Sequence, residues 1–171
     1  SWLRTLTEAL ALIALIAAVY AVMARLGIAP VEEMPPGRLV AIDGDTLRGP
    51  DGDIRLYGID APELHQTCEG PKGRDYPCGR DARNRLDRLT RGKALACEVR
   101  DTDRFGRAVS VCRAGDLDIN RQMVTDGWAV AYPGRTDYEG EEAEARDAAR
   151  GLWSGAFQPP KAWRREHPRG P

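Results

Sequence analysis

The stretch RLVAIDGDTLRGPDGDIRLYGI, residues 38–59, decides the fold of this chain. Its segments RLVAID, TLRG and IRLYGI are short and rich in Val, Ile and Leu, and the first alternates apolar and polar residues as a half-buried strand does. DGDT and PDGD separate them, and Asp-Gly is a strong turn sequence. The pattern predicts three strands joined by tight turns, which form a meander.

The rest of the chain supplies two more strands and about three helices. CGRDARNRLDRLTRGK, from Cys78, spaces Ala82, Leu86 and Leu89 as a helix does and has Gly92 near its end. ALACEVRD and RAVSVCR form a hairpin around TDRFGR, and DLDINRQMVTDG and TDYEGEEAEARDAARG predict helices. This order predicts an α+β fold, a five-stranded OB-type β-barrel capped by helices, and such barrels bind oligonucleotides on one face.

The first residues, SWLRTLTEALALIALIAAVYAVMARLG, differ from the rest because no charge lies between Glu8 and Arg25. Arg4 precedes this apolar run, as in the basic leader of a secretory signal. A buried amphipathic helix is the alternative, but apolar residues all round the helix argue against it. We therefore predict a signal peptide or a signal-anchor helix and leave its cleavage open. The rest of the chain is then extracytoplasmic, either periplasmic or secreted, and is anchored to the membrane by residues 9–24 if the helix is retained.

We divide the chain into four parts. Residues 1–27 are the signal or anchor helix, residues 28–37 (IAPVEEMPPG) a linker, residues 38–157 the barrel domain, and residues 158–171 a tail rich in Pro and Arg. The net charge of −1 lacks the basic excess that is typical of nucleic-acid binders, so attraction to phosphate must come from local patches. A monomer is expected.

The four cysteines agree with export, because an even number in an exported chain favours disulfides. None of their spacings is Cys-x-x-Cys, so a zinc site is not expected. Cys68 and Cys78 bracket the loop CEGPKGRDYPC, and Cys97 and Cys112 lie symmetrically about DRFG, as on facing strands. We predict the disulfides Cys68–Cys78 and Cys97–Cys112. Four separate buried thiols are the alternative.

Carboxylates follow two of the predicted strands. Asp45 leaves the turn DGDT and Asp60 leaves IRLYGI, so both can point to one spot at the rim of the barrel. Taken singly, each is an ordinary turn or strand-end residue. Taken together, adjacent carboxylates stay ionised only beside a cation, and calcium accepts a loose set of oxygen ligands.

Three more charged residues fit phosphate chemistry. Glu63, after the turn at Pro62, is placed to hold a water as a general base. Arg55 lies on the strand that leads to Asp60, and its guanidinium suits a phosphate and the charge that develops on it during attack. Arg107, in DRFGR, is by itself an ordinary turn residue. The whole set indicates a metal-assisted site that cleaves phosphodiester bonds.

AIDGDTL, RLYGIDAPE and DRFGR resemble the three signature segments of the staphylococcal nuclease (thermonuclease) family, in the same order and with similar spacing. The resemblance extends from about Arg38 to about Trp153 and includes DGWAVAY and EEAEARDAARGLW. It implies a staphylococcal-nuclease-like barrel, and it implies the site as follows: catalytic residues Arg55, Glu63 and Arg107; Ca²⁺ ligands Asp45, Asp60 and the backbone carbonyl of Ala61; and Tyr132 beside a nucleotide. The best-studied member of the family has a threonine in place of Ala61.

The implied reaction is hydrolysis of DNA or RNA by a calcium-dependent endonuclease, which leaves 3′-phosphate ends. Glu63 activates the water, and Arg55 and Arg107 stabilise the phosphoryl transition state. Single strands are expected to be preferred, because their bases can splay onto the barrel face and stack there. Two alternatives stay open: a nuclease-like module that binds nucleic acid without cutting, and an exported barrel that binds another partner. The chain keeps all five charged residues, which favours the nuclease.

Overall fold

The computed structural model describes residues 2–26 and 33–168 of the 171-residue chain. The chain divides into two compact units, residues 1–32 and residues 33–171. Residues 28–32 of the predicted linker lie outside the described residues, as do residues 1 and 27 of the predicted export helix and residues 169–171 of the predicted tail. The four-part division of the chain stays a prediction.

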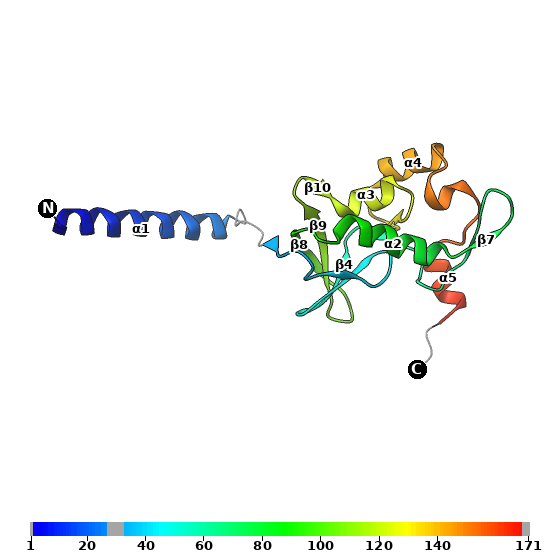
Figure 1. Ribbon diagram of the computed structural model, residues 1–171, viewed down its shortest axis with the longest axis horizontal. Helices are drawn as coiled ribbons and strands as arrows, with labels where there is room; N and C mark the ends of the chain where they lie inside the picture. The colour runs from blue at the N-terminus through cyan, green and yellow to red at the C-terminus, as the bar shows by residue number, and fades with distance from the viewer. Residues whose placement is uncertain (1, 27–32, 169–171) are drawn as a thin grey trace. The chain divides into compact units, whose positions relative to one another are not determined.

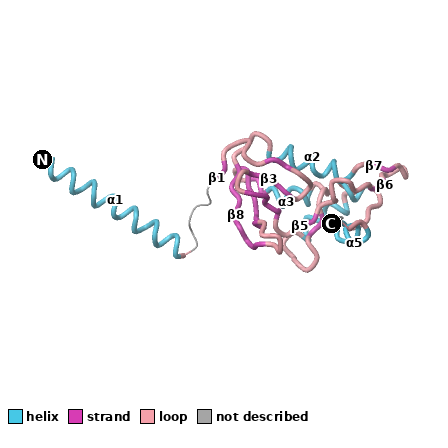
Figure 2. Tube along the Cα trace, turned by 90° about the horizontal axis from the view of Figure 1, so that it is seen from below, coloured by secondary structure: helices cyan, strands magenta, loops and turns pink. Residues whose placement is uncertain are grey.

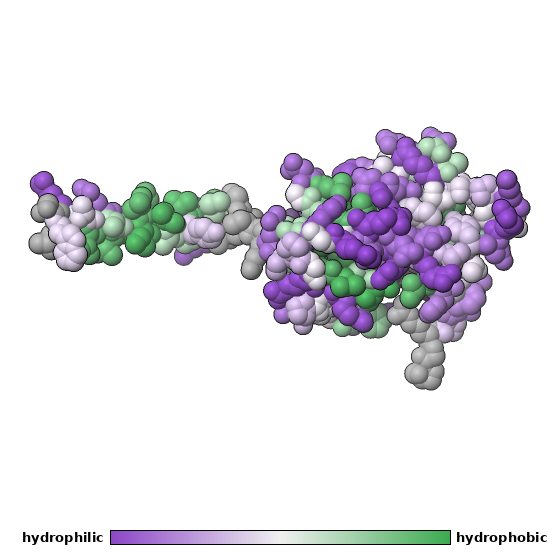
Figure 3. All heavy atoms as spheres, viewed as in Figure 1, coloured by the Kyte–Doolittle hydropathy of each residue, from purple (hydrophilic) through white to green (hydrophobic). Residues whose placement is uncertain are grey.

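In the first unit the described residues form one helix, α1 (Trp2–Arg25), drawn in blue in Figure 1. Its segment Arg4–Met23 is 20 residues long with a mean hydropathy of 2.2, which is sufficient by length and composition to cross a membrane. Figure 3 shows apolar side chains along the visible face of this helix, and Leu10, Ile13 and Leu15 are more than half exposed. A signal sequence near an N-terminus has the same properties, so both forms of the predicted export helix remain open.

Short strands make the wall of the second unit (Figures 1 and 2). Those of its large sheet are β1 (Glu33–Met34), β2 (Val40–Ala41), β3 (Thr46–Gly49), β4 (Gly52–Leu56), β8 (Leu95–Thr102), β9 (Ala108–Ala114) and β10 (Leu117–Asp118). They lie in the order β1-β8-β9-β4-β3-β2, and β10 pairs with β9. Two smaller sheets pair β5 (Ile59–Asp60) with β11 (Val130–Ala131) and β6 (Cys68–Glu69) with β7 (Asp75–Tyr76).

The predicted meander is confirmed, because β2, β3 and β4 pair antiparallel in sequence order. The predicted hairpin is also present as β8 and β9. Strand β4 then pairs with β9 in parallel, with Ile54 opposite Ala108, so that the meander and the hairpin become one curled mixed sheet. This half-barrel with helices is the OB-type α+β fold that the sequence predicts.

The second unit also contains α2 (Cys78–Thr90), α3 (Ile119–Thr125), α4 (Glu139–Asp147), α5 (Pro160–Glu166) and the 3₁₀ turn η1 (Gly151–Ser154). Helix α2 buries Ala82, Leu86 and Leu89, the residues whose spacing predicts it. Helix α5 is an addition to the three helices expected, and it forms where the sequence predicts a tail. Pro160 begins it, because the fixed φ of proline suits the first helical turn.

The core lies between the sheet and the helices, and both predicted disulfide pairs are present. Its largest fully buried apolar side chains are Leu47, Leu56, Ile59, Leu86, Ile119, Met123, Val124 and Leu152. Cys97 is bonded to Cys112 across β8 and β9, and Cys68 is bonded to Cys78 between β6 and the start of α2. Because Cys68–Cys78 joins β6 to the first residue of α2, it ties the segment that follows Glu63 to this helix.

Asn120, on α3, ties two backbone groups of β9 to the residue that follows β4. Its Oδ1 accepts a hydrogen bond from the backbone N–H of Cys112 at 3.0 Å. Its Nδ2 donates to the carbonyl oxygens of Tyr57 at 2.9 Å and Ser110 at 3.0 Å. The Asn120 side chain is fully buried, and it therefore sets where the chain leaves β4 on its way to β5.

Candidate active site

Asp45 is positioned by the β3–β4 hairpin. Thr46 pairs with Arg55 in this hairpin, and the backbone N–H of Leu56 donates to the carbonyl of Asp45 at 2.8 Å. The hydroxyl of Thr46 donates to Oδ1 of Asp45 at 3.1 Å. The Asp45 carboxylate is thus held at the end of the hairpin next to the side chain of Arg55.

Asp60 is positioned by a sharp turn at Gly58. The φ of Gly58 is +75°, and a Cβ at this position would lie 2.8 Å from Cε2 of the buried Tyr138 ring. Only glycine meets both conditions without strain. The chain then enters β5, where Asp60 lies opposite Val130 of β11. This turn returns the chain towards Arg55.

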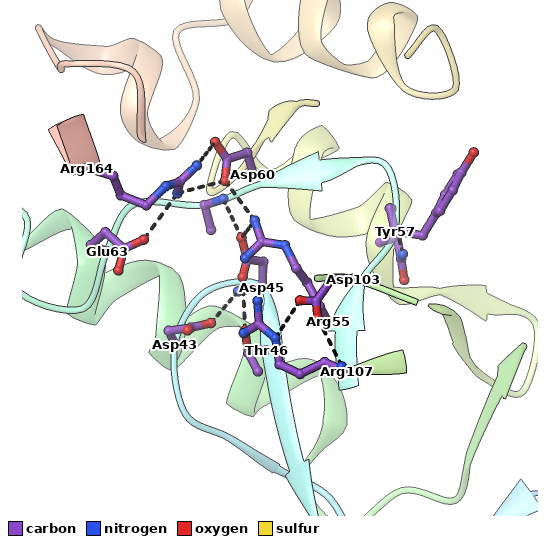
Figure 4. A network of polar contacts seen from close by, with 12 residues as sticks. Asp43, Asp45, Thr46, Arg55, Tyr57, Asp60, Glu63, Asp103, Arg107 and Arg164 are labelled. Carbon is purple, nitrogen blue, oxygen red and sulfur yellow. Dashed lines mark hydrogen bonds and ion pairs between the residues drawn. The ribbon is translucent and has the colours of Figure 1, made fainter. Parts of the chain in front are cut away.

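The guanidinium of Arg55 joins the two aspartates, as Figure 4 shows. Its Nη2 lies 2.9 Å from Oδ2 of Asp45 and 2.9 Å from Oδ1 of Asp60. Oδ2 of Asp45 also accepts the backbone N–H of Ala61 at 3.0 Å. Asp45 and Asp60 are only 3% and 1% exposed. The structure therefore brings the predicted ligand residues and Arg55 into one buried cluster.

Burial and ion pairing shift the pKa values of Asp60 and Arg55 in opposite directions. Burial raises the pKa of Asp60, although hydrogen bonds from Arg164 and the charge of Arg55 oppose this shift. Burial lowers the pKa of Arg55, but the charges of Asp45 and Asp60 outweigh it and raise the pKa of Arg55. Arg55 therefore stays charged, and its charge holds the two buried aspartates together.

A third carboxylate, Asp43, borders the cluster. Its Oδ1 accepts the backbone N–H of Asp45 at 3.0 Å. Burial, and next the charge of Asp45, raise the pKa of Asp43 from 3.8 to about 6. Between these two values the folded protein keeps a proton that the unfolded chain releases, so this group lowers the stability as the pH rises from about 4 to 6.

Replacing Asp43 by Asn is expected to raise the free energy of unfolding at pH 7 by about 2 kcal/mol in metal-free buffer, because the amide is neutral and keeps an oxygen acceptor. The gain should shrink as the pH falls from 6 to 4 and vanish only below about pH 3.8, where Asp43 is protonated in both states. Urea denaturation of both proteins at pH 4, 5, 6 and 7 measures the difference. A gain that is constant across this range would show that the raised pKa of Asp43 is not its cause.

Glu63 lies on a loop that packs against the start of α2. Its carbonyl accepts the backbone N–H of Gln66 at 2.7 Å, and its own N–H donates to Oε1 of Gln66 at 3.3 Å. Gln66 is fully buried, and its Nε2 donates to the carbonyl of Gln158 at 2.7 Å. Gly79 of α2 lies so close that a Cβ there would overlap the carbonyl oxygen of Glu63. The backbone of Glu63 is thus fixed from several sides.

Replacing Gly79 by Ala is expected to lower the free energy of unfolding by about 1–3 kcal/mol, because the new methyl group overlaps backbone that cannot move freely. Gly140 is the matched control, since it is also the second residue of a helix and a Cβ there meets nothing within 4 Å. Gly140→Ala should raise stability by about 0.5 kcal/mol. Urea denaturation compares the variants, and equal effects would mean that the contact with Glu63 does not constrain α2.

Arg164, on α5, contacts Asp60 and Glu63 at once (Figure 4). Its Nη1 donates to Oδ1 of Asp60 at 3.0 Å and to Oε1 of Glu63 at 3.1 Å, and its Nη2 donates to Oδ2 of Asp60 at 2.9 Å. Burial lowers the pKa of Arg164, but these hydrogen bonds and charges outweigh it and raise the pKa. This contact could not be predicted from the sequence, because Arg164 is 104 and 101 residues from the two carboxylates along the chain.

Arg107 lies at the start of β9, beside β4. Ile54 of β4 and Ala108 of β9 face each other in parallel register. Because side chains alternate along a strand, Arg55 and Arg107, the residue directly before β9, fall on the opposite face from this pair. Nε of Arg107 donates to Oδ2 of Asp103 at 2.7 Å. The structure therefore places Arg107 on the sheet face of Arg55 but pairs it with Asp103 rather than with the cluster.

Tyr132 follows β11, and its backbone N–H donates to the carbonyl of Gly58 at 2.8 Å. It therefore lies beside the turn that leads to Asp60, and its place next to a nucleotide stays a prediction.

Tyr57, which directly precedes Gly58, is an aromatic residue near the site that the sequence analysis missed. The guanidinium of Arg135 lies 4.3 Å from the centre of its ring. The sequence feature that could have placed Tyr57 near the site is its position two residues after Arg55.

The donor atoms of the cluster suit a hard cation. Among residues 2–26 and 33–168, no group of three or more His, Cys, Asp or Glu side chains is arranged to hold a metal ion. Two carboxylates, Asp45 and Asp60, nevertheless converge on one guanidinium, with the backbone of Ala61 in contact with one of them. Calcium completes such a set with carbonyl groups and waters, so these residues fit the ion that the sequence predicts.

A groove borders the loop that contains Glu63. It has a volume of about 730 Å³ and is lined by Val40, Ala41, Ile42, Leu64, Pro77, Arg80, Asp81, Arg83 and Asn84. Ile42 directly precedes Asp43, and Leu64 directly follows Glu63. Arg80 and Arg83 give the groove positive charge next to apolar walls, which is local basic surface on a chain of nearly neutral net charge.

Comparison with known proteins shows which family the chain resembles. Residues 53–155 match the family model described as "Staphylococcal nuclease homologue". The chain is 37% identical over 123 residues to "Succinoglycan biosynthesis protein ExoI" of Rhizobium meliloti (strain 1021), covering 68% of this chain and 63% of that protein. It is 36% identical over 133 residues to "Probable staphylococcal-like nuclease CAN3" of Oryza sativa subsp. japonica, covering 75% of this chain and 33% of that protein.

A third relative is similar over most of its own length. The "Uncharacterized endonuclease" of Escherichia coli O157:H7 is 36% identical over 141 residues, which cover 75% of this chain and 84% of that protein. By contrast, the matched region spans only 63% and 33% of the lengths of the first two relatives.

Proposed function

Since this chain belongs to the staphylococcal nuclease family, we propose that it is a calcium-dependent endonuclease that hydrolyses phosphodiester bonds of DNA and RNA. Single strands are preferred, and the products carry 3′-phosphate ends. One observation supports this proposal above the others. Arg55 bridges Asp45 and Asp60 within a buried cluster that also reaches Glu63 through Arg164.

Arg55 and Arg107 hold the phosphate in this proposal. Among the described residues, only Nη2 of Arg55 is paired, so its Nε and Nη1 remain to donate to phosphoryl oxygens. Nε of Arg107 donates to Asp103, and among the described residues its two Nη atoms have no hydrogen-bond acceptor, so they can donate to phosphoryl oxygens as well. Two fixed guanidinium groups on one sheet face stabilise the negative charge that develops on the phosphate during attack.

Glu63 takes the proton of the attacking water. Its backbone is fixed by Gln66 and by the contact with Gly79, so the carboxylate acts from a rigid loop. A base held in this way directs water to the phosphorus atom, and the 5′ oxygen leaves. Tyr132 and Tyr57 offer rings on which unpaired bases stack, which favours single strands.

Asp45, Asp60 and the carbonyl of Ala61 are the residues that would hold calcium. When bound, the ion neutralises charge on the phosphate and helps to position it. Both aspartates are buried and already oriented by Arg55, Thr46 and the backbone of Ala61, so the chain prepares these oxygens for a cation.

The apolar helix α1 and the two disulfides support an extracytoplasmic location, because disulfides persist outside the reducing cytoplasm. The domain is periplasmic or secreted in this proposal, anchored to the membrane if α1 is kept, and active as a monomer. Its partners are DNA and RNA.

The test is cleavage of single-stranded DNA and of RNA by the full chain in detergent, with calcium or with a chelator. We expect cutting that depends on calcium. The 3′ ends of the products should accept a label only after a phosphatase has removed the 3′-phosphate. Binding without cutting would favour the nuclease-like binding module. Neither binding nor cutting by a folded protein would favour the partner-binding barrel.

A further inference from the structure

Arg164, which contacts the candidate metal ligand Asp60 and the candidate general base Glu63, lies outside the signature segments of the family. Helix α5 begins after residue 155, where the family match ends. Its Arg164 nevertheless makes three hydrogen bonds to Asp60 and Glu63, between 2.9 and 3.1 Å. This residue therefore belongs to the site by geometry although no signature segment contains it.

The guanidinium of Arg164 provides the positive charge that a cation would provide. Both oxygens of the Asp60 carboxylate accept hydrogen bonds from it, and Oδ1 also accepts one from Arg55. A carboxylate oxygen accepts about two hydrogen bonds, so Oδ1 is fully used. A calcium ion on Asp60 would lie close to the Arg164 guanidinium, and these like charges repel.

The structure also shows how the helix that carries Arg164 is held at the site. Gln158, which precedes α5, accepts the hydrogen bond from the buried side chain of Gln66, and Pro160 is buried. These contacts anchor the start of α5 to the loop of Glu63. The side chain of Arg164 itself is 32% exposed, so it can turn away from the carboxylates without unpacking this anchor.

We propose that Arg164 competes with the divalent cation for Asp60 and Glu63 and thereby sets the cation concentration at which the site becomes occupied. The inference rests on the calcium-dependent function proposed above. In the metal-free protein, Arg164 neutralises two carboxylates that would otherwise repel each other. When calcium binds Asp60, the guanidinium leaves Asp60 and Glu63.

Calcium binding to the full chain in detergent, measured by isothermal titration calorimetry, tests this competition. If Arg164 occupies the carboxylates for about nine-tenths of the time, Arg164→Gln should lower the apparent Kd for calcium about tenfold. Arg165→Gln is the matched control, because Arg165 is the next residue on α5 and is exposed. Its Kd should stay within about twofold of the wild-type value, since a surface charge contributes little.

Two further measurements keep the result interpretable. Arg164→Lys retains the charge but not the two-pronged hydrogen bonding, so its Kd should lie between those of the wild type and Arg164→Gln. In the absence of calcium, Arg164→Gln should melt at a lower temperature than the wild type, and added calcium should raise its Tm by more. If Arg164→Gln does not fold without calcium, the Kd of Arg164→Lys for calcium tests the competition instead.

Equal or weaker calcium binding by both Arg164 variants, in folded protein, would overturn the competition and leave the proposed nuclease function standing. Absence of calcium binding by the wild type and by all variants, together with cleavage in the presence of chelator, would overturn the calcium dependence itself. The two failures are therefore distinguishable.

Discussion

Replacing Glu63 by Gln is expected to slow phosphodiester cleavage by about 10²–10⁴-fold, because a general base contributes a factor of this size. Glutamine has nearly the same shape as glutamate but cannot take a proton from water. Its side chain can still accept a hydrogen bond from Arg164, as Oε1 of Glu63 does at 3.1 Å, so the fold should be retained. The rate constant under single-turnover conditions with saturating calcium measures this effect directly.

Glu98→Gln is the control for the Glu63 variant. Glu98 is exposed on β8 and pairs with Arg100 at 3.1 Å, so its replacement removes the same charge at a distance from the cluster. It should cleave at close to the wild-type rate. If Glu63→Gln kept more than about a tenth of the wild-type rate, Glu63 would not be the general base, and another group would have to activate the water.

Replacing Asn120 by Ala is expected to lower the free energy of unfolding by about 3–5 kcal/mol, the largest effect on stability that we predict. The substitution leaves the N–H of Cys112 and the carbonyl of Tyr57 without this partner at a fully buried site. The carbonyl of Ser110 keeps the hydrogen bond from the N–H of Tyr57 at 2.8 Å. Each orphaned buried group costs about 1–3 kcal/mol. Urea denaturation at pH 7 measures the loss.

Asn84→Ala is the control for the Asn120 variant, because Asn84 is exposed on α2 and accepts one long hydrogen bond from Arg83 at 3.3 Å. Its stability should change by less than about 0.5 kcal/mol. A loss of similar size in both variants would mean that the hydrogen bonds of Asn120 to β9 and Tyr57 do not stabilise the fold. Since Asn120 fixes the carbonyl of Tyr57, its loss should also reduce cleavage by the protein that remains folded.

The barrel and most of the site could be predicted because local sequence signals agree with the fold. DGDT and PDGD set the turns of the meander, and the 3.6-residue spacing of Ala82, Leu86 and Leu89 sets α2. Asp45 and Asp60 were expected to meet because each follows a strand of this meander. The structure places both within 2.9 Å of Arg55.

Contacts between distant segments could not be predicted in the same way. Nothing in the order of residues shows that α5 returns to the loop of Glu63, since this depends on the hydrogen bond from Gln66 to Gln158. The raised pKa of Asp43 depends on burial, which the turn sequence DGDT does not reveal. The pairing of Arg107 with Asp103 is local, within DRFGR, but it was also missed because this motif by itself describes only an exposed turn.

The parallel pairing of β4 with β9 has a consequence for the order in which the molecule folds. Ile54 and Ala108 belong to segments that are separated by β5, α2 and β8, so a long loop must close before they meet. Closure of this kind is entropically costly and comes late, whereas the β3–β4 and β8–β9 hairpins are local. Arg55 and Arg107 therefore come to share one face only near the end of folding. The chain should thus complete the proposed active site only after its hairpins and helices have formed.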